Sequence, residues 1–191
     1  MIKVISYINK LFTSVSYIVF DDESRDCWII DVGDYAEIKS LISDYKLKGV
    51  FLTHAHFDHI YGLNFLLVDY PSIPVYTNIN GQKSLYTPSD NLSVYHDENF
   101  VLDSDNVVVV KDGDKIEIAN SMIHIYETPG HDYSCITYKL NHYLFTGDAY
   151  IPGVRVFTKL QNGNKHDSEQ SLIKIHQLAT EDTILMPGHN V

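Results

Sequence analysis

Short apolar runs and alternation of apolar with polar residues, both typical of β-strands, recur along both halves of the chain. The expected strands are residues 3–7, 14–20, 27–31, 50–53, 107–110, 115–118, 122–126, 135–140, 143–145 and 183–186. Residues 73–76 form a further apolar piece, in which Pro74 favours a strand end or an edge strand. The pattern therefore predicts a protein with a strand-rich half on each side of an irregular middle.

Other segments carry apolar residues at helical spacing. The expected helices are residues 34–45, 60–68 and 168–179. Asp34 is the expected N-cap of the first helix, and Asp167 that of the last, with Gln170 three residues later in a capping-box arrangement. Residues 87–106 show neither period and predict a long surface loop. Because there is no sharp repeat and no linker, residues 1–191 are interpreted as one domain.

Composition narrows the class of protein. With 191 residues, of which 45% are hydrophobic, the chain can bury a substantial core without disulfides. It has no apolar run of roughly 18 residues, so we expect no membrane span. The net charge of −11 argues against a nucleic-acid partner, because phosphates attract basic groups. A small-molecule substrate is expected instead, and the sequence sets no oligomeric state.

Cysteine content and the first residues of the chain indicate a cellular compartment. The two cysteines, Cys27 and Cys135, suit a reducing environment. The start of the chain lacks the basic region, apolar core and cleavage site of a signal peptide. We therefore expect a cytoplasmic protein.

Residues 54–59 are the densest chemical signal, with three imidazoles and a carboxylate in six positions: His54, His56, Asp58 and His59. Such side chains repel one another when protonated and lose hydration when buried in the neutral form. A divalent metal ion removes both difficulties by binding the nitrogen lone pairs and neutralising the carboxylate. The cluster therefore predicts a metal site.

Three distant residues fit the same site. His131, Asp148 and His189 each follow a glycine directly, and each comes just after an expected strand. Glycine allows the sharp backbone turn that aims the next side chain toward a common point. Four segments of this kind predict that their side chains meet at one centre.

The order His-x-His-x-Asp-His, Gly-His, Gly-Asp and Gly-His resembles the metallo-β-lactamase-fold hydrolase superfamily, and most closely its hydroxyacylglutathione hydrolases (glyoxalase II). The resemblance implies an α/β fold, a four-layer αββα sandwich of two mixed sheets with helices on the outer faces. It also implies, by position, a first metal site, a second metal site and a bridging carboxylate: His54, His56 and His131; Asp58, His59 and His189; and Asp148.

The chemistry that this resemblance implies is hydrolysis. Two zinc ions, with iron or manganese as alternatives, would hold a hydroxide that attacks a small thioester, ester or lactone. Asp58 and Asp148 are expected to act in catalysis as well as in metal binding. Tyr150, just beyond Asp148, is the candidate donor to the substrate carbonyl.

Two departures make glutathione a doubtful part of the substrate. The sequence ends two residues beyond His189, without the C-terminal helical region that glyoxalase II uses to hold glutathione. Residues 132–134 are Asp-Tyr-Ser rather than the usual Thr-Pro-Gly. We therefore expect a small substrate of one of these three classes.

Other functions remain open. A lactonase would use the same centre. An enzyme similar to the persulfide dioxygenases would hold one iron on His54, His131 and Asp148. A β-lactamase of the main zinc subclass would carry a cysteine in place of Asp148 and a secretion signal. A binding module with structural metal would have closed, often cysteine-rich sites.

A few further residues are candidates for substrate or ligand contacts. Arg155 and Lys159 are cations near the Asp148 loop that either bind an anionic substrate group or form surface ion pairs. Cys135 is close enough in sequence to His131 to approach the site. The terminal carboxylate of Val191 is a candidate acceptor for the His189 ring.

Overall fold

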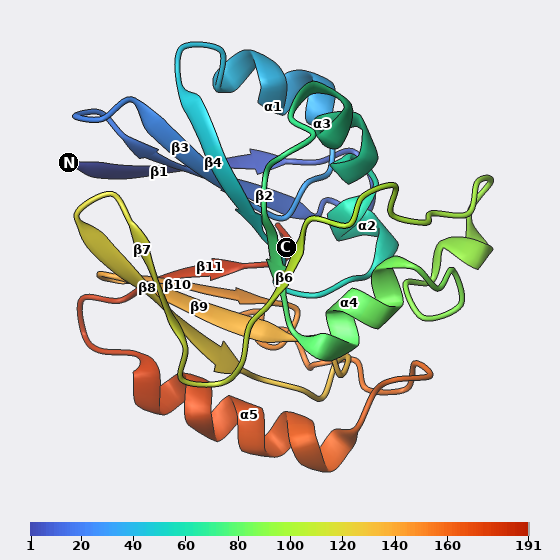
Figure 1. Cartoon of the computed structure of the whole chain (residues 1–191). Coiled ribbons are helices and arrows are strands. Elements are labelled where there is room, and N and C mark those ends of the chain that lie inside the picture. Colours follow the sequence, from blue (N-terminus) through green and yellow to red (C-terminus); the bar gives the residue numbers. More distant parts are fainter. Residues whose placement is uncertain (191) are drawn as a thin grey trace.

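Two β-sheets pack face to face in this computed structural model, which describes residues 1–190 (Figure 1). The first sheet has the order β1-β2-β3-β4-β5-β6, with β1–β3 antiparallel and β3–β6 parallel. Its strands are β1 (Ile2–Ile8), β2 (Val15–Asp21), β3 (Asp26–Ile30), β4 (Lys46–Phe51), β5 (Val75–Thr77) and β6 (Val107–Val109).

The second sheet has the order β11-β10-β9-β8-β7, and only its β10–β11 pair is parallel. Its strands are β7 (Lys115–Ile118), β8 (Ser121–Glu127), β9 (Ile136–Leu140), β10 (Tyr143–Gly147) and β11 (Ile184–Pro187). Both sheets are therefore mixed, as the resemblance implies.

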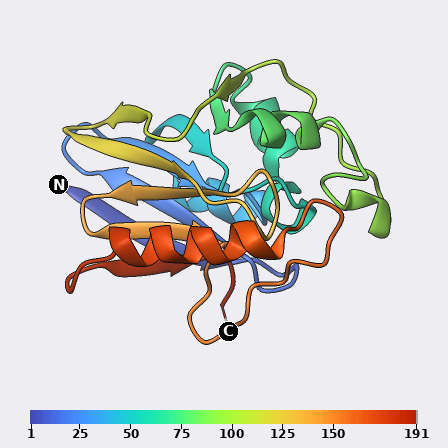
Figure 2. The ribbon, with the colours of Figure 1, turned by 90° about the horizontal axis from the view of Figure 1, so that it is seen from below.

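Helices cover the outer face of each sheet, which gives the four expected layers. Helices α1 (Tyr35–Leu41) and α3 (Leu63–Asp69) lie on the first sheet, and α5 (Lys165–Leu178) lies on the second (Figures 1 and 2). The short helices α2 (Phe57–Ile60) and α4 (Ile79–Leu85) lie in the connections. None of the helices in residues 1–190 has the length and apolar character needed to cross a membrane.

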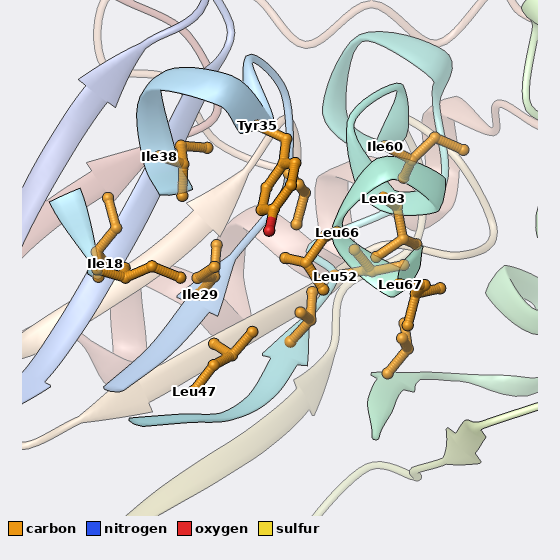
Figure 3. Close-up of a cluster of buried hydrophobic side chains, with 14 of the residues drawn as sticks. Ile18, Ile29, Tyr35, Ile38, Leu47, Leu52, Ile60, Leu63, Leu66 and Leu67 are labelled. Atoms are coloured by element: carbon orange, nitrogen blue, oxygen red, sulfur yellow. The ribbon is translucent and has the colours of Figure 1, made fainter. Parts of the chain in front are cut away.

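The alternating side chains of β2 pack into two cores, one between the first sheet and its helices and one between the two sheets. Ile18 and Phe20 pack under α1 and α3, whereas Tyr17 and Val19 pack between the sheets. Neighbouring side chains of a strand point to opposite faces, so a strand between two apolar layers is buried throughout. Figure 3 shows Ile18 in the outer core with side chains from the helices above it.

Helices lie near all three predicted segments, but several of them begin or end at other residues than predicted. The segment expected at 60–68 is two helices, α2 and α3, separated by a turn at Tyr61 and Gly62. Helix α4 was missed, because it has too few apolar residues to show a helical stripe. Pro74 precedes β5 directly, which confirms the strand-end alternative, since β5 lies inside the sheet.

The loop at 87–106 follows the predicted irregular course, apart from a 3-10 turn (Ser93–Tyr95), but it is anchored in the core. Phe100 and Leu102 are buried in the outer core. The Asn91 side-chain amide donates to the carbonyls of Ser84 and Phe100. Buried hydrogen bonds and two apolar anchors therefore hold a segment whose sequence shows no period.

The predicted N-cap of α5 is wrong. The helix begins at Lys165, and Asn164 is its N-cap, with a side-chain oxygen that accepts the N–H groups of His166 and Asp167. Asn164 also donates its own backbone N–H to Gly130, beside His131. Asp167 lies inside the first turn, where its charge still favours the helix dipole.

We expect Asn164→Ala to lower the free energy of unfolding by about 1 kcal/mol, because two N–H groups of α5 lose their acceptor. Chemical denaturation followed by circular dichroism measures this loss. The matched control Asn164→Asp keeps a capping oxygen and should stay close to wild type. Equal stability of the alanine and aspartate variants would contradict the assignment of the cap.

Candidate metal centre

The ends of four strands, β4 of the first sheet and β8, β10 and β11 of the second, bring the seven predicted ligand side chains together. His54 and His56 follow β4, and α2 comes next. The remaining loops follow β8, β10 and β11. The side chains form groups whose donor atoms lie within 4.8 Å of one another: His54, His56 and His131; His54, His59 and Asp148; and Asp58, His59 and His189.

The first group consists of three buried imidazoles. His56 Nδ1 lies 3.0 Å from His131 Nε2. The ring centroids of His54 and His56 are 4.7 Å apart, so residues two apart in the chain bring their rings side by side. His54 Nε2 is buried and has no hydrogen-bond partner among the described residues. A buried nitrogen without a partner is costly, and a metal ion would satisfy it.

Asp58, His59 and His189, hereafter the second group, include a carboxylate. His59 Nε2 lies 3.4 Å from His189 Nε2 and 3.5 Å from Asp58 Oδ2. His189 Nε2 lies 3.4 Å from the same oxygen of Asp58. Three donor atoms at these mutual distances face a common position.

Asp148 lies between the two groups. Its Oδ2 is 3.6 Å from His131 Nε2 and 3.2 Å from His189 Nε2, while its Oδ1 is 3.6 Å from His59 Nε2. Asp148 Oδ1 is also buried without a hydrogen-bond partner in residues 1–190. The carboxylate is therefore placed to contact both groups at once.

Burial and charge act oppositely on the histidines of the cluster. Burial lowers the pKa of His54 well below its ordinary value, and the nearby His59 and His56 lower it further. Burial also lowers the pKa of His59, but the charge of Asp58 and the contact with Asp31 outweigh it and raise the pKa to about 10. The pKa of His54 is thus lowered while that of its neighbour His59 is raised. A divalent cation bound by both rings would require the neutral form of each.

The donor atoms fit a divalent metal. Imidazole nitrogens and carboxylate oxygens suit zinc, iron and manganese, and two such groups lie on either side of one carboxylate. Asp148 is held ionised, because contact with His189 and the surrounding histidine charges outweigh its burial and keep its pKa well below the usual range. Its negative charge is therefore available to a metal at neutral pH.

Contacts behind the donor groups orient the rings. His131 Nδ1 lies 2.9 Å from the carbonyl of Phe157, and His189 Nδ1 lies 2.8 Å from that of Phe12. A carbonyl only accepts, so each Nδ1 carries the proton and each Nε2 is free to bind a metal.

Asp31, which was not predicted from the sequence, orients the His59 ring by accepting from its Nδ1. Its Oδ2 lies 2.9 Å from His59 Nδ1, and its carboxylate also accepts the N–H and hydroxyl of Thr53 at 2.7 and 2.6 Å. Asp31 has a positive φ of 57° at the end of β3. A polar residue at a strand end was the signal that could have identified it, as for Asp148.

Two of the glycines that precede predicted ligands are required by close approach. Gly130 has φ +137°, and a Cβ there would lie 2.3 Å from the backbone of Ser168 in α5. A Cβ on Gly188 would lie 2.1 Å from Asp148 Oδ1. Side chains at these positions would displace α5 or the central carboxylate, so both glycines are part of the centre.

A cavity of about 260 Å³ opens onto the centre and is lined by His131, Asp148 and His189. Its remaining walls are mostly apolar and come from the β1–β2 turn and the segment after β10: Phe12, Thr13, Ile151, Val154, Arg155, Val156 and Phe157. Arg155 is exposed and makes no ion pair with any residue from 1 to 190, so it is a free cation beside the centre.

Some predicted residues lie elsewhere. The Tyr150 ring packs 5.1 Å from the His176 ring and against the small core under α5, and it does not line the cavity. Its predicted catalytic role therefore lacks structural support. Cys135 is buried in the same core, where burial raises the pKa of its thiol. Lys159 is exposed and does not line the cavity, and Val191 lies outside the described residues.

Comparison with known proteins identifies the family. A sequence profile of the metallo-beta-lactamase superfamily matches residues 10–189. The chain belongs to the metallo-β-lactamase superfamily, an enzyme superfamily whose fold binds divalent metal ions. The resemblance to this superfamily and the αββα fold that it implies are confirmed.

The curated relatives include hydroxyacylglutathione hydrolases. Those of Salmonella typhi and Salmonella enteritidis are each 30% identical over 175 residues, which are 91% of this chain. The same region is 60% of each relative, so the chain spans about three fifths of their length.

Solved structures agree on the fold. The B3 metallo-β-lactamase BLEG-1 has a TM-score of 0.88 at 23% identity, covering 99% of this chain and 92% of that one. ETHE1 from Myxococcus xanthus has a TM-score of 0.78 at 24% identity, covering 100% and 76%. TTHA1623, solved in a di-iron-bound form, has a TM-score of 0.81 at 22% identity, covering 98% and 92%.

Zinc binding to the metal-free protein at pH 7 should release protons. His59, with a pKa of about 10, is protonated at that pH, and a ring nitrogen must lose its proton to bind a metal. A zinc titration in weak buffer with an indicator dye measures the release. The variant Asp31→Asn, which removes a carboxylate that raises this pKa, should release fewer protons. Tight binding without proton release would contradict this charge state.

Proposed function

We propose that this protein is a metal-dependent hydrolase that cleaves a small thioester, ester or lactone with two zinc ions at the centre. The observation that carries the proposal is the position of Asp148, which lines the cavity and lies within 3.6 Å of His131 in the first group and of His59 and His189 in the second. Two groups sharing one carboxylate suit a pair of ions better than one closed structural site.

When bound, such a pair of ions lowers the pKa of a water molecule and polarises a substrate carbonyl. The residues of the chain supply the rest. Asp148 and Asp58 place negative charge between and beside the histidines, and the rings are held in fixed tautomers by the acceptors behind them. The buried Cys135 thiol, with its raised pKa, is a poor nucleophile, so a water-dependent reaction fits better.

The substrate class rests on both the relatives and the cavity. The relatives named hydroxyacylglutathione hydrolase support a thioester, although the chain spans about 60% of their length. The cavity, of about 260 Å³, suits a small acyl group, and its apolar walls are interrupted by the Arg155 guanidinium. We therefore propose an acyl substrate with an anionic group.

A mononuclear iron dioxygenase is the second candidate, supported by the fold shared with ETHE1 and by the proximity of His131 to Asp148. This candidate gives no role to Asp58, His59 and His189. Those three form a donor group of their own with distances of 3.4–3.5 Å. The assembled second group favours the dinuclear hydrolase.

Elemental analysis of protein purified without added metal tests the proposal directly. We expect two zinc ions per chain and turnover in a screen of thioesters, esters, lactones and β-lactams, lost on chelation and restored by zinc. An oxygen electrode runs in parallel with the screen. One iron per chain with oxygen consumption would establish the dioxygenase instead, and full hydrolytic activity without metal would end the proposal.

Arg155→Ala should raise KM about tenfold for a thioester that ends in a carboxylate, because a charge-assisted contact is lost. KM for the methyl ester of the same thioester should hardly change. Steady-state kinetics on the two substrates measures the difference. Lys159→Ala is the matched control, since Lys159 is exposed outside the cavity. An equal change for both substrates, or an equal effect of both variants, would exclude this role for Arg155.

A further inference from the structure

Asp132 is a buried carboxylate directly behind one of the predicted metal ligands. Its side chain is 2% exposed, and its Oδ2 lies 3.3 Å from His56 Nε2. Neither atom has a hydrogen-bond partner elsewhere in residues 1–190. An ionised oxygen and a ring nitrogen, both buried and both otherwise unpaired, thus face only each other.

The other oxygen of Asp132 holds the carboxylate in place. Oδ1 accepts the backbone N–H of Ser134 at 2.7 Å and also the Ser134 hydroxyl. The same hydroxyl oxygen accepts the backbone N–H of Ala55, between His54 and His56, at 3.1 Å. Asp132 and Ser134 therefore join the loop that follows β4 to the loop that carries His131.

We propose that Asp132 is a positioning residue that holds His56 with Nε2 toward the carboxylate and Nδ1 toward the first metal ion. A neutral imidazole carries one proton, and a carboxylate can only accept it, so Asp132 places that proton on Nε2. The lone pair of Nδ1 is then free, on the side where His131 Nε2 lies 3.0 Å away. This inference rests on the proposed metal centre.

The charge of Asp132 complements a group that has little negative charge of its own. The first group consists of three imidazoles, with Asp148 Oδ2 3.6 Å from His131 Nε2, whereas the second group contains the carboxylate of Asp58 itself. Asp132 stands behind His56 as Asp31 stands behind His59, at 3.3 and 2.9 Å. A carboxylate behind a ligating imidazole strengthens its hold on the metal.

The test is the zinc affinity of Asp132→Asn. The amide keeps the shape and can still accept from Ser134, but it has no charge and can donate to Nε2, which favours the wrong tautomer. Competition with a chromophoric chelator should show one of the two zinc ions bound about 10–100-fold more weakly. Visible spectra of the cobalt-substituted protein should show a change at one site only.

Ser134→Ala is the matched control. It removes the hydroxyl that joins the two loops but leaves the Asp132 carboxylate facing His56. We expect this variant to lower the thermal stability of the chelated protein while both zinc affinities stay near wild type. A fall in affinity equal to that of Asp132→Asn would mean that loop bracing, not the contact with His56, is responsible, and would overturn the proposal.

A second measurement uses the wild-type protein and does not depend on a variant that folds. Nitrogen-15 NMR of the zinc-loaded protein should show His56 bound through Nδ1, with the proton on Nε2. Binding through Nε2, or wild-type affinity for both ions in Asp132→Asn, would overturn the role of Asp132 alone. A wild-type protein that binds no divalent ion would overturn the proposed function as well.

Discussion

The candidate metal centre depends on the electrostatic interactions among buried histidines and carboxylates at the ends of strands from both sheets. His54 is fully buried with its pKa pushed down, while His59, with a ring centroid 4.2 Å away, is held protonated by carboxylates. His54 Nε2 and Asp148 Oδ1 are both buried without a hydrogen-bond partner in residues 1–190, which is unfavourable for polar atoms. A cation bound at these atoms would offset this unfavourable burial.

The two sheets hold these buried polar side chains in place. The loops of the centre leave from β4, β8, β10 and β11, whose ends are fixed by strand pairing on both sides of a closely packed core. The rigidity extends outward through Asp31, Asp132 and the carbonyls of Phe12 and Phe157, each of which accepts from, or faces, a ring nitrogen. Ligand side chains supported in this way cannot turn away to reach water, so they remain poised for a metal.

The sequence predicted what depends on residue type and missed what depends on local hydrogen bonding. The spacing of histidines and aspartates was enough to predict that Asp58, His59 and His189 lie together, since that pattern rarely has another cause. It was not enough to place the start of α5, because Asn164 and Asp167 are both good caps and only the folded backbone selects one. The position of Tyr150 next to Asp148 in the chain does not determine where its ring packs. The ring lies against His176 and does not line the cavity.

The residues that could bind metal and the residues that form the rest of the cavity come from different parts of the chain. The donor groups come from strand ends within the region that the superfamily profile matches, whereas the other walls of the cavity come from two connecting segments, the β1–β2 turn and residues 151–157. Phe12 and Phe157 contribute to both, because their carbonyls orient ligand rings and both residues line the cavity. A change in these loops that alters the substrate thus also bears on the orientation of His189 and His131. If the cavity binds the substrate of the proposed reaction, substrate choice and metal geometry would be coupled through the backbone of these loops.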